Sequence, residues 1–337
     1  MAHRPRTHVT MARETYDLLF DDARRARLGR IAWARQPVFL PDLRDPAAAA
    51  CLAEVETLVT SWGAAALDAE VLDLMPRLRA VFHAAGTVRD IATPALWERG
   101  IVVTTAADHN AIPVAEYTFA AIILATKRAF FHVRRASHGP ESWRAHAGRA
   151  GYGALGRTIG VVGFSRTGRR VVERLRQLEG ARILVADPFA DADAVRAAGA
   201  ELVTLADLLP SVDVLTLHAP ELPSTRHMIG ARELAALPDG AVLINTARGA
   251  LVDHDALARA CAAGRIDAVL DVTDPEPLPT SSPLLALDNV AVTPHLAGSL
   301  GGETRRLADA ALDELEAYAA GLPPRHPVRA SDMAVGA

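Results

Sequence analysis

The stretch TIGVVGFSRTG, residues 158–168, leads from a short apolar run through a glycine turn into helix-forming residues. A second apolar run, residues 182–186, follows this helix and ends at Asp187, 19 residues after Gly168. Strand, glycine turn, helix, strand and acid in this order are typical of a βαβ unit that binds a dinucleotide. This stretch therefore predicts a parallel α/β fold.

Each residue of the turn has an expected task. Gly163 makes the tight turn out of the strand, and Gly168 lets the helix pack closely on it. Ser165 stands where the usual pattern has a second glycine, and we expect its small side chain, with Arg166 and Thr167, to lie beside the pyrophosphate at the helix N-terminus. The alternative is an ordinary turn between a strand and a helix.

Asp187 is expected to bind the ribose diol of the dinucleotide. A carboxylate at this position favours NAD over NADP, because it would repel a 2′-phosphate and residues 188–190 offer no arginine. The alternative is a turn residue at the end of a strand, before Pro188.

Outward from this unit, short apolar runs alternate with helical stretches in both directions, which predicts parallel sheets covered on both faces. Upstream strands are expected at Pro37–Leu40, Glu56–Thr60, Ala80–His83 and Ile101–Thr105, with helices at Ala66–Leu74 and Thr93–Glu98. A long helix is expected at 111–136, opened by Pro113 near its first turn, and a loop at 137–157. Further strands are expected at Thr158–Gly163, Arg182–Ala186, Glu201–Thr204, Val214–His218, Ala241–Asn245, Ala268–Val272 and Val290–Thr293, before a last helix at Glu303–Ala320.

Composition limits the classes of protein. A chain of 337 residues is long enough for two domains, and its net charge of −4 argues against nucleic acid as a partner. Cys51 and Cys261 match no metal spacing, so we expect no metal site and free thiols in a reducing compartment. Because no apolar segment follows the basic N-terminus and the longest apolar run, 119–126, is too short to span a bilayer, we expect a soluble cytoplasmic protein.

Three residues late in the chain carry the chemistry. Arg248, Glu276 and His295 each follow a predicted strand, and the carboxyl ends of parallel strands are where the sites of such folds gather. The cation can hold a substrate carboxylate, the imidazole can exchange a proton with a carbonyl oxygen, and the carboxylate can keep the imidazole charged. Taken singly, each could be a solvated surface residue, so the prediction depends on their order and spacing.

At this point the chain resembles the D-isomer-specific 2-hydroxyacid dehydrogenases, over roughly residues 76–318. The likeness is densest in LPDGAVLINTARGALVD, residues 237–253, and continues through Asp271-Val272, Glu276-Pro277 and Thr293-Pro294-His295. Further matches are His218-Ala219-Pro220 and Asn110 with Val114-Ala115-Glu116.

The resemblance implies a role for each matching residue. Arg248 would bind the substrate carboxylate and carbonyl, His295 would be the acid/base and Glu276 its partner, and Asp271 would contact the nicotinamide carboxamide. The other positions expected to line the cofactor are His218, Ala219, Pro220, Thr225, Thr246, Ala247 and Gly298, with Arg248 and His295 also close to it.

The resemblance also implies the architecture. We expect two Rossmann/flavodoxin-like parallel-sheet α/β domains, with an NAD-binding domain, 109–298, inserted into a discontinuous substrate-binding domain, 1–108 and 299–337. Relatives of this kind are usually homodimers, with the long helix near 111–136 at the interface. We expect no regulatory domain after the last helix.

One loop departs from the family pattern. Residues 83–90 read HAAGTVRD, so Ala84 replaces the first of two glycines and Val88-Arg89 replaces an acid-amide pair. This loop lends backbone N–H groups to the substrate carboxylate in the family, so Ala85, Gly86 and Arg89 are candidate substrate-binding residues. One hypothesis is that Arg89 favours a substrate with a second anionic group, and the alternative is a solvated arginine in an arginine-rich chain.

The sequence thus predicts an NAD-dependent D-2-hydroxyacid dehydrogenase that acts on a small 2-keto or 2-hydroxy acid. The alternative is a binding protein of the same fold, a dinucleotide-sensing corepressor. The presence of Arg248, Glu276 and His295 together favours the enzyme.

Overall fold

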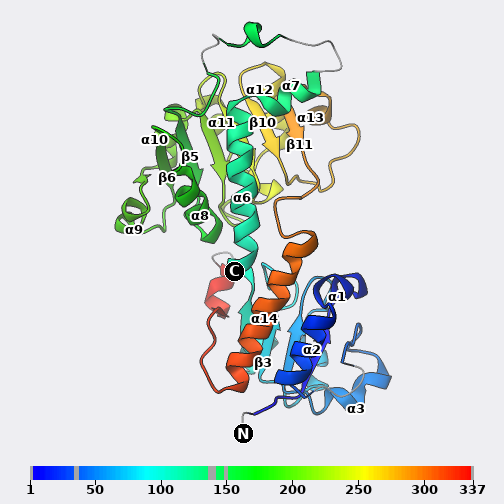
Figure 1. Ribbon diagram of the computed structural model, residues 1–337. Helices are drawn as coiled ribbons and strands as arrows, with labels where there is room; N and C mark the ends of the chain where they lie inside the picture. The colour runs from blue at the N-terminus through cyan, green and yellow to red at the C-terminus, as the bar shows by residue number, and fades with distance from the viewer. Residues whose placement is uncertain (1–2, 34–37, 136–141, 148–150, 335–337) are drawn as a thin grey trace. The chain divides into compact units, whose positions relative to one another are not determined.

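The computed structural model describes residues 3–33, 38–135, 142–147 and 151–334 of the chain (Figure 1). It divides into two compact units, one made of Met1–Asn110 and Ser299–Ala337, the other of Ala111–Gly298. Each unit contains a largely or wholly parallel sheet. This confirms the predicted fold class of two parallel-sheet α/β units, one of them discontinuous in sequence.

The first unit has a five-stranded sheet in the order β1-β2-β3-β4-β12. Strands β1 to β4 are parallel, and β12 pairs antiparallel with β4 at the edge. The strands are β1 Thr7–Thr10, β2 Thr57–Thr60, β3 Ala80–His83, β4 Val102–Thr105 and β12 Pro327–Val328.

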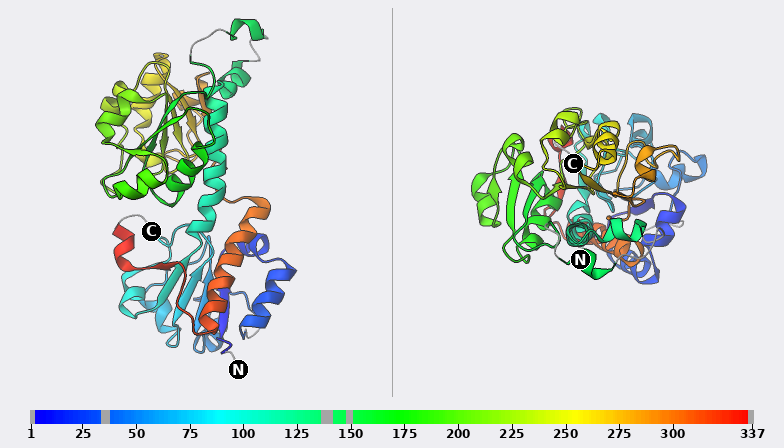
Figure 2. Two further views of the ribbon diagram at one scale, coloured as in Figure 1. Left: turned by 60° about the vertical axis from the view of Figure 1, so that its left-hand side comes forward. Right: turned by 90° about the horizontal axis from the view of Figure 1, so that it is seen from above.

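Side chains that alternate along these strands bury both faces of this sheet. Val59 and Phe82 pack with α1, α2 and α14 on one face, whereas Leu58 and Val81 pack with α3, α4 and α5 on the other. Figures 1 and 2 show α14 on the same face as the N-terminal helices. The helices are α1 Arg13–Leu19, α2 Asp22–Ile31, α3 Ala49–Leu52, α4 Ala69–Asp73, α5 Pro94–Glu98 and α14 Thr304–Ala319, with 3-10 turns at Pro46–Ala48, Gly301–Glu303 and Ala330–Ala334.

The second unit has a seven-stranded parallel sheet in the order β11-β10-β9-β8-β5-β6-β7. The chain leaves β5 toward β6 and β7 on one side and returns to β8 on the other, so the strand order reverses between β5 and β8. Ligands of open α/β sheets bind outside the carboxyl ends of the strands at such a point. The strands are β5 Thr158–Val162, β6 Arg182–Ala186, β7 Glu201–Leu202, β8 Val214–Leu217, β9 Val242–Asn245, β10 Asp267–Leu270 and β11 Val290–Val292.

Helices cover both faces of the second sheet as well. Val161 and Ile244 pack on the face that carries α6 to α9, and Val162 and Leu243 on the face that carries α10 to α13. The helices are α6 Ala107–Thr126, which begins in the first unit, α7 Ala129–Arg135, α8 Arg166–Leu175, α9 Ala192–Ala197, α10 Leu205–Leu208, α11 Ala231–Ala236, α12 His254–Ala262 and α13 Pro283–Ala286, with 3-10 turns at Trp143–Ala145, Leu209–Ser211 and Gly249–Leu251.

The single helix expected at 111–136 is wrong at both ends. The structure has α6 from Ala107 to Thr126 and a separate α7, and Pro113 lies inside α6 rather than in its first turn. Arg128 separates the two helices with a left-handed backbone, φ 58°, a conformation that ends helices. Its guanidinium binds Asp267 and the carbonyl of Gly240. Residue 136 and part of the expected loop 137–157 lie outside the described residues.

Two strands were missed and two were overestimated, one of them at Glu201–Thr204, where β7 spans only Glu201–Leu202. Strand β1 carries buried threonines rather than an apolar run, and the Thr7 and Thr57 hydroxyls bond each other at 2.7 Å. The two-residue β12 starts with a proline, which suits an edge position. In the described part of the expected strand Pro37–Leu40, only Phe39 forms a bridge, with Val9, and Pro37 lies outside the described residues.

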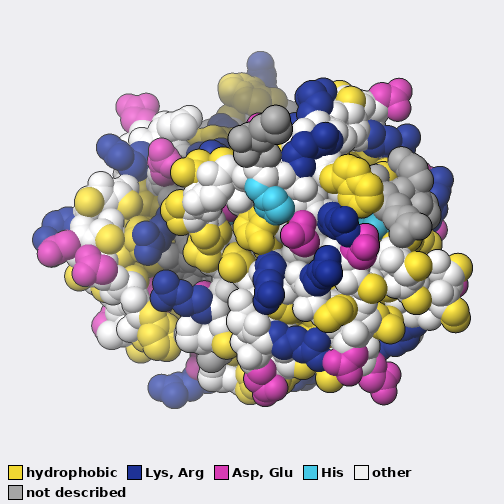
Figure 3. Space-filling model, turned by 90° about the horizontal axis from the view of Figure 1, so that it is seen from below, with side chains coloured by type: hydrophobic (Ala, Val, Ile, Leu, Met, Phe, Trp, Pro, Cys, Tyr) yellow, Lys and Arg dark blue, Asp and Glu magenta, His cyan; other side chains and the backbone are white. Residues whose placement is uncertain are grey.

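The surface and the helices add two observations. On the face drawn in Figure 3, arginine side chains alternate with Asp and Glu. Within the described ranges, no helix combines the length and apolar character needed to cross a bilayer.

Candidate active site

The residues singled out in the second unit gather at one edge of its sheet. Gly163, His218 and Thr246 directly follow β5, β8 and β9. Asp271 directly follows β10, and Thr293 directly follows β11. Because all of these strands are parallel, the residues lie at the same carboxyl edge, which includes the point of reversal between β5 and β8.

The glycine turn has the close contacts that its motif requires. Gly163 has φ 96°, and a Cβ there would lie 2.6 Å from the backbone nitrogen of Ala219. A Cβ at Gly168 would lie 2.0 Å from the carbonyl oxygen of Gly163. Only glycine fits either position, so the turn packs directly against the start of α8 and against the loop after β8.

Ser165 caps α8. Its Oγ accepts a hydrogen bond from the backbone N–H of Gly168 at 3.2 Å, and Arg166 and Thr167 begin the helix. A serine at this position satisfies an N–H group that a helix start otherwise leaves without an intrahelical partner. A contact between the Ser165 hydroxyl and a phosphate stays a prediction.

Asp187 lies against the same turn. Its Oδ2 accepts from the backbone N–H of Phe164 at 2.7 Å, and its Oδ1 accepts from Phe189 N–H at 2.8 Å. The first bond links the acid at the end of β6 to the turn after β5. The structure therefore unites the two features that the sequence motif pairs, a glycine turn and an acid.

The segment after β8 is firmly held. His218 is 4% exposed, and burial lowers its pKa to about 3, so the imidazole is neutral at ordinary pH. Its Nε2 lies 3.0 Å from the Thr216 hydroxyl, while its buried Nδ1 has no hydrogen-bond partner among the described residues. Thr225 closes the following loop by donating to the carbonyl of Pro220 at 2.7 Å and accepting from Leu222 N–H at 2.9 Å.

Arg248 lies on the loop after β9, and hydrogen bonds with Asn245 hold the backbone of this loop. The fully buried Asn245 accepts from Ala247 N–H at 3.1 Å and donates to the carbonyl of Arg248 at 2.9 Å. The guanidinium of Arg248 is exposed and donates to the carbonyl of Ala247 at 2.7 Å. Asn245 was not among the predicted site residues, although its place at the end of a buried strand was the available signal.

Gly249 brings the Arg248 loop against the loop that carries Glu276. A Cβ at Gly249 would lie 2.0 Å from the carbonyl carbon of Thr273, so any other residue would force the two loops apart. The conformation of these neighbouring loops is thus coupled through one glycine.

His295 and Glu276 form a pair. The Nδ1 of His295 lies 2.7 Å from the Oε1 of Glu276, and the two side chains are 49% and 42% exposed. The two residues come from the loops after β11 and β10, which are adjacent strands. The sequence prediction that these two residues meet agrees with this geometry, and the paired imidazole keeps its Nε2 available for other contacts.

Asp271 holds the loop that carries His295. It is 1% exposed, its Oδ1 accepts from the Thr293 hydroxyl at 2.6 Å and from Leu296 N–H at 2.7 Å, and its Oδ2 accepts from Ala297 N–H at 2.9 Å. Gly298 follows directly at the end of the unit. Both carboxylate oxygens are therefore engaged within the loop, and a contact with a carboxamide stays a prediction.

The candidate substrate loop belongs to the first unit. Ala85 is buried, and a Cβ at Gly86 would lie 3.1 Å from the Nδ2 of Asn110. The Nη2 of Arg89 donates to the carbonyl of Met333 at 2.8 Å, which joins this loop to the C-terminal 3-10 turn. Arg89 therefore has a protein partner, and its predicted role toward a second anionic group remains untested.

Neither of two cavities found in the second unit lies at this edge. They have volumes of about 300 and 210 Å³, and their lining includes Arg128, Arg157, Asp213 and Asp267, at the amino ends of the strands. Within the described residues, no group of His, Cys, Asp and Glu side chains is arranged to hold a metal ion.

These features define a two-unit α/β protein with a dinucleotide-type turn and an imidazole-carboxylate pair at one sheet edge. Residues 120–297 match the family model described as "D-isomer specific 2-hydroxyacid dehydrogenase, NAD binding domain". The chain belongs to the D-isomer-specific 2-hydroxyacid dehydrogenase family, as its resemblance predicted.

Relatives and solved structures agree with this assignment. The chain is 37% identical over 262 residues to a glyoxylate reductase of Korarchaeum cryptofilum, covering 77% of this chain and 78% of that one. It is 35% identical over 263 residues to a D-3-phosphoglycerate dehydrogenase of Archaeoglobus fulgidus, covering 78% of this chain but 49% of that one. A crystal structure of a phosphoglycerate oxidoreductase from Rhizobium etli superposes with a TM-score of 0.83 at 27% identity, covering 99% and 100% of the two chains. The chain thus spans about half the length of the phosphoglycerate dehydrogenase relative.

Proposed function

We propose that this protein is a nicotinamide-dependent oxidoreductase that interconverts a small 2-keto acid and the D-2-hydroxy acid. The observation that carries the proposal is the 2.7 Å contact between His295 Nδ1 and Glu276 Oε1 at the sheet edge that also holds the glycine turn. Arg248, on the loop after the neighbouring β9, supplies the cation that a carboxylate substrate needs.

The residues divide the work as follows. Arg248 binds the substrate carboxylate and fixes which face of C2 is presented, because a planar guanidinium binds a carboxylate in one plane. Glu276 occupies Nδ1 of His295, so Nε2 is the nitrogen that gives a proton to the carbonyl oxygen and takes it back in the reverse direction. When bound, the nicotinamide supplies or accepts the hydride.

The turn fits a dinucleotide. Gly163 and Gly168 leave no room for a Cβ, Ser165 caps α8, and Asp187 is fixed beside the turn. We propose that these residues hold the cofactor together with Arg166, Thr167, the 218–220 segment, Thr225, Thr246 and Ala247. Asp187 favours NAD over NADP because a 2′-phosphate beside its carboxylate would be repelled.

The same proposal has three further parts. The first unit binds the substrate, the protein forms a homodimer, and its partner is a small 2-keto acid. Support for the substrate class comes from the names of the relatives, a glyoxylate reductase and a D-3-phosphoglycerate dehydrogenase. Support for Ala85, Gly86 and Arg89 comes from their place in the family pattern.

The test is a panel of 2-keto acids with NADH, scored by loss of NADH absorbance: glyoxylate, hydroxypyruvate, oxaloacetate, 2-oxoglutarate and phenylpyruvate. We expect turnover of at least one acid, with NADPH used at least about tenfold less well than NADH. Arg248→Lys should lower kcat/KM by about a hundredfold or more, because an ammonium cannot replace a bidentate contact.

Arg232→Lys, an exposed arginine on α11, is the matched control and should leave kcat/KM within about twofold. If no acid on the panel is reduced while NADH binds, the proposed reaction is wrong. Equal use of NADPH would refute only the cofactor choice.

A further inference from the structure

Helix α6 places two hydroxyl groups against the loops of the candidate site. The Tyr117 hydroxyl lies 2.9 Å from Thr293 Oγ1, and the Thr118 hydroxyl lies 2.8 Å from Thr246 Oγ1. The faces of α6 around them are largely apolar, and the Tyr117 ring packs beside the core of the second unit. The contact between Tyr117 and Thr293 connects α6 to the loop that carries His295.

The direction of this hydrogen-bond chain follows from its proton count. A threonine hydroxyl has one proton, and Thr293 Oγ1 lies 2.6 Å from Asp271 Oδ1, which as a carboxylate can only accept. Thr293 therefore donates to Asp271, and Tyr117 must donate to Thr293. Burial raises the pKa of Tyr117, so the phenol keeps the proton that this arrangement needs.

This series of hydrogen bonds ends at the backbone of the loop that carries the His295 imidazole. The carboxylate of Asp271 accepts from Leu296 and Ala297 N–H, and its carbonyl accepts from His295 N–H at 2.9 Å. His295 itself has φ 56°, in the left-handed region that residues with a side chain seldom adopt. Such a conformation persists only where surrounding contacts impose it.

We propose that Tyr117 is a positioning residue that acts on His295 through Thr293 and Asp271. The phenol hydroxyl fixes the Thr293 hydroxyl, and the Thr293 hydroxyl fixes the Asp271 carboxylate, which holds the N–H groups of Leu296 and Ala297 directly after His295. These contacts hold the His295 backbone in the conformation that brings its imidazole to Glu276. The inference rests on the proposed function, because it concerns the acid/base of that reaction.

The first test removes single hydroxyls. Tyr117→Phe keeps the ring and should lower kcat about threefold to tenfold, with the KM for NADH within about twofold. Thr293→Val should lower kcat further, because it also removes one of the two donors to Asp271 Oδ1, whereas Thr293→Ser should restore most of the activity. Adding Tyr117→Phe to Thr293→Val should cost little more, since the chain is already broken.

Tyr152→Phe is the matched control. It removes another tyrosine hydroxyl of the same unit, one that lies 3.0 Å from His132 rather than near the site, and should leave kcat unchanged. A wild-type kcat in Tyr117→Phe, or a Thr293→Ser variant as impaired as Thr293→Val, would overturn the inference.

A second test needs no substrate, so it separates failure of this inference from failure of the proposed function. The imidazole NMR signals of protein labelled with [15N]histidine can be assigned for His295 by their loss in His295→Gln. Tyr117→Phe should shift the His295 signals, whereas Tyr152→Phe should shift signals of its own histidine neighbours and leave those of His295 in place. Unchanged His295 signals in Tyr117→Phe would overturn the inference even if the enzyme proved active.

Discussion

His295 and the glycines at the carboxyl edge of the second sheet show how much depends on single residues. His295 adopts φ 56°, and its side chain contacts Glu276 while three N–H groups of its loop bond to Asp271. Gly168 and Gly249 lie where a Cβ would be 2.0 Å from a backbone atom. Close backbone contacts therefore require glycine at positions 168 and 249. The neighbouring His295 and Glu276 supply the polar groups of the candidate site.

Two separate glycine-to-alanine variants, one at Gly168 and one at Gly29, test this account. Gly168→Ala should weaken NADH binding by at least about tenfold and destabilise the second unit by about 2 kcal/mol or more, because the Cβ meets a backbone oxygen that cannot move aside cheaply. Gly29→Ala has nothing within 4 Å of the added Cβ and lies inside α2, so it should raise the free energy of unfolding by about 0.5–1 kcal/mol. Fluorescence titration with NADH and urea unfolding measure both. Wild-type NADH binding by Gly168→Ala would contradict this account of the turn.

The sequence indicated candidate site residues but not the residues that support them. The order of Arg248, Glu276 and His295 after three strands was enough to expect the last two to meet, because parallel strands end at one edge. Asn245 was missed despite its place at the end of a buried strand. Tyr117 and Thr293 were missed because a hydroxyl in a buried element has no pattern of its own. Tyr117 and Thr293 are also distant in the chain, since their positions differ by 176.

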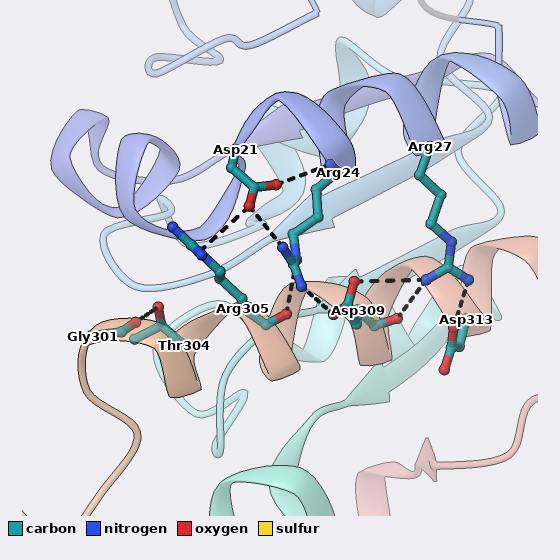
Figure 4. A network of polar contacts seen from close by, with 8 residues as sticks. All are labelled: Asp21, Arg24, Arg27, Gly301, Thr304, Arg305, Asp309 and Asp313. Carbon is teal, nitrogen blue, oxygen red and sulfur yellow. Dashed lines mark hydrogen bonds and ion pairs between the residues drawn. The ribbon is translucent and has the colours of Figure 1, made fainter.

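Among the elements, α2 and α14 illustrate packing that polar residues reinforce. Arg24 on α2 bonds Asp21, Asp309 and the carbonyl of Arg305, and Arg27 bonds Asp313 (Figure 4). Arg27 also bonds Glu316. The side chains of Arg24 and Arg27 are only 17% and 23% exposed, so these ion pairs are less screened by solvent than most surface pairs.

Loss of this network should lower stability measurably. Arg24→Met keeps the aliphatic stem but removes the contacts to α14, and we expect the free energy of unfolding to fall by about 1–2 kcal/mol. Arg196→Met removes one exposed pair with Asp193 within α9 and should cost no more than about 0.5 kcal/mol. Urea unfolding of the two variants provides the comparison, and equal losses would show that the network adds nothing beyond ordinary surface pairs.

Helices and strands were predicted well where one strong sequence pattern determines their limits. The strands and the helix of the βαβ unit follow the expected ranges closely, because apolar runs between glycines and acids are buried on both faces. The C-terminal end of the long helix was misplaced because it depends on Arg128, whose partners Asp267 and Gly240 are remote in sequence. Strand β1 was missed because its threonines pair with those of β2, a contact that no local pattern reveals.

For the whole molecule, each unit contains a buried histidine whose charging opposes folding. Burial lowers the pKa of His83 in the first unit to about 4, and that of His218 in the second to about 3. A histidine in the unfolded chain has a pKa near 6.5. Between these values the unfolded chain binds protons that the folded chain does not.

Stability should therefore be highest above about pH 6.5 and fall as the pH drops toward 4, by at most about 1.4 kcal/mol per pH unit for each histidine. His83→Gln should reduce this slope, whatever it does to the overall stability. Urea midpoints measured across this pH range give the slopes. The same slope in His83→Gln as in the unchanged protein would refute the assignment.

The central claim, hydride transfer with His295 as the acid/base, is tested most directly by following deuterium into the product of a 2-keto acid from the panel, starting from NADH with deuterium at both C4 positions. We expect deuterium at C2 of the D-2-hydroxy acid, and in His295→Gln we expect no labelled product while NADH still binds within a few fold of the unchanged protein. NADH binding by the unchanged protein with no labelled hydroxy acid from any member of the panel would contradict the claim and favour a dinucleotide-sensing protein instead.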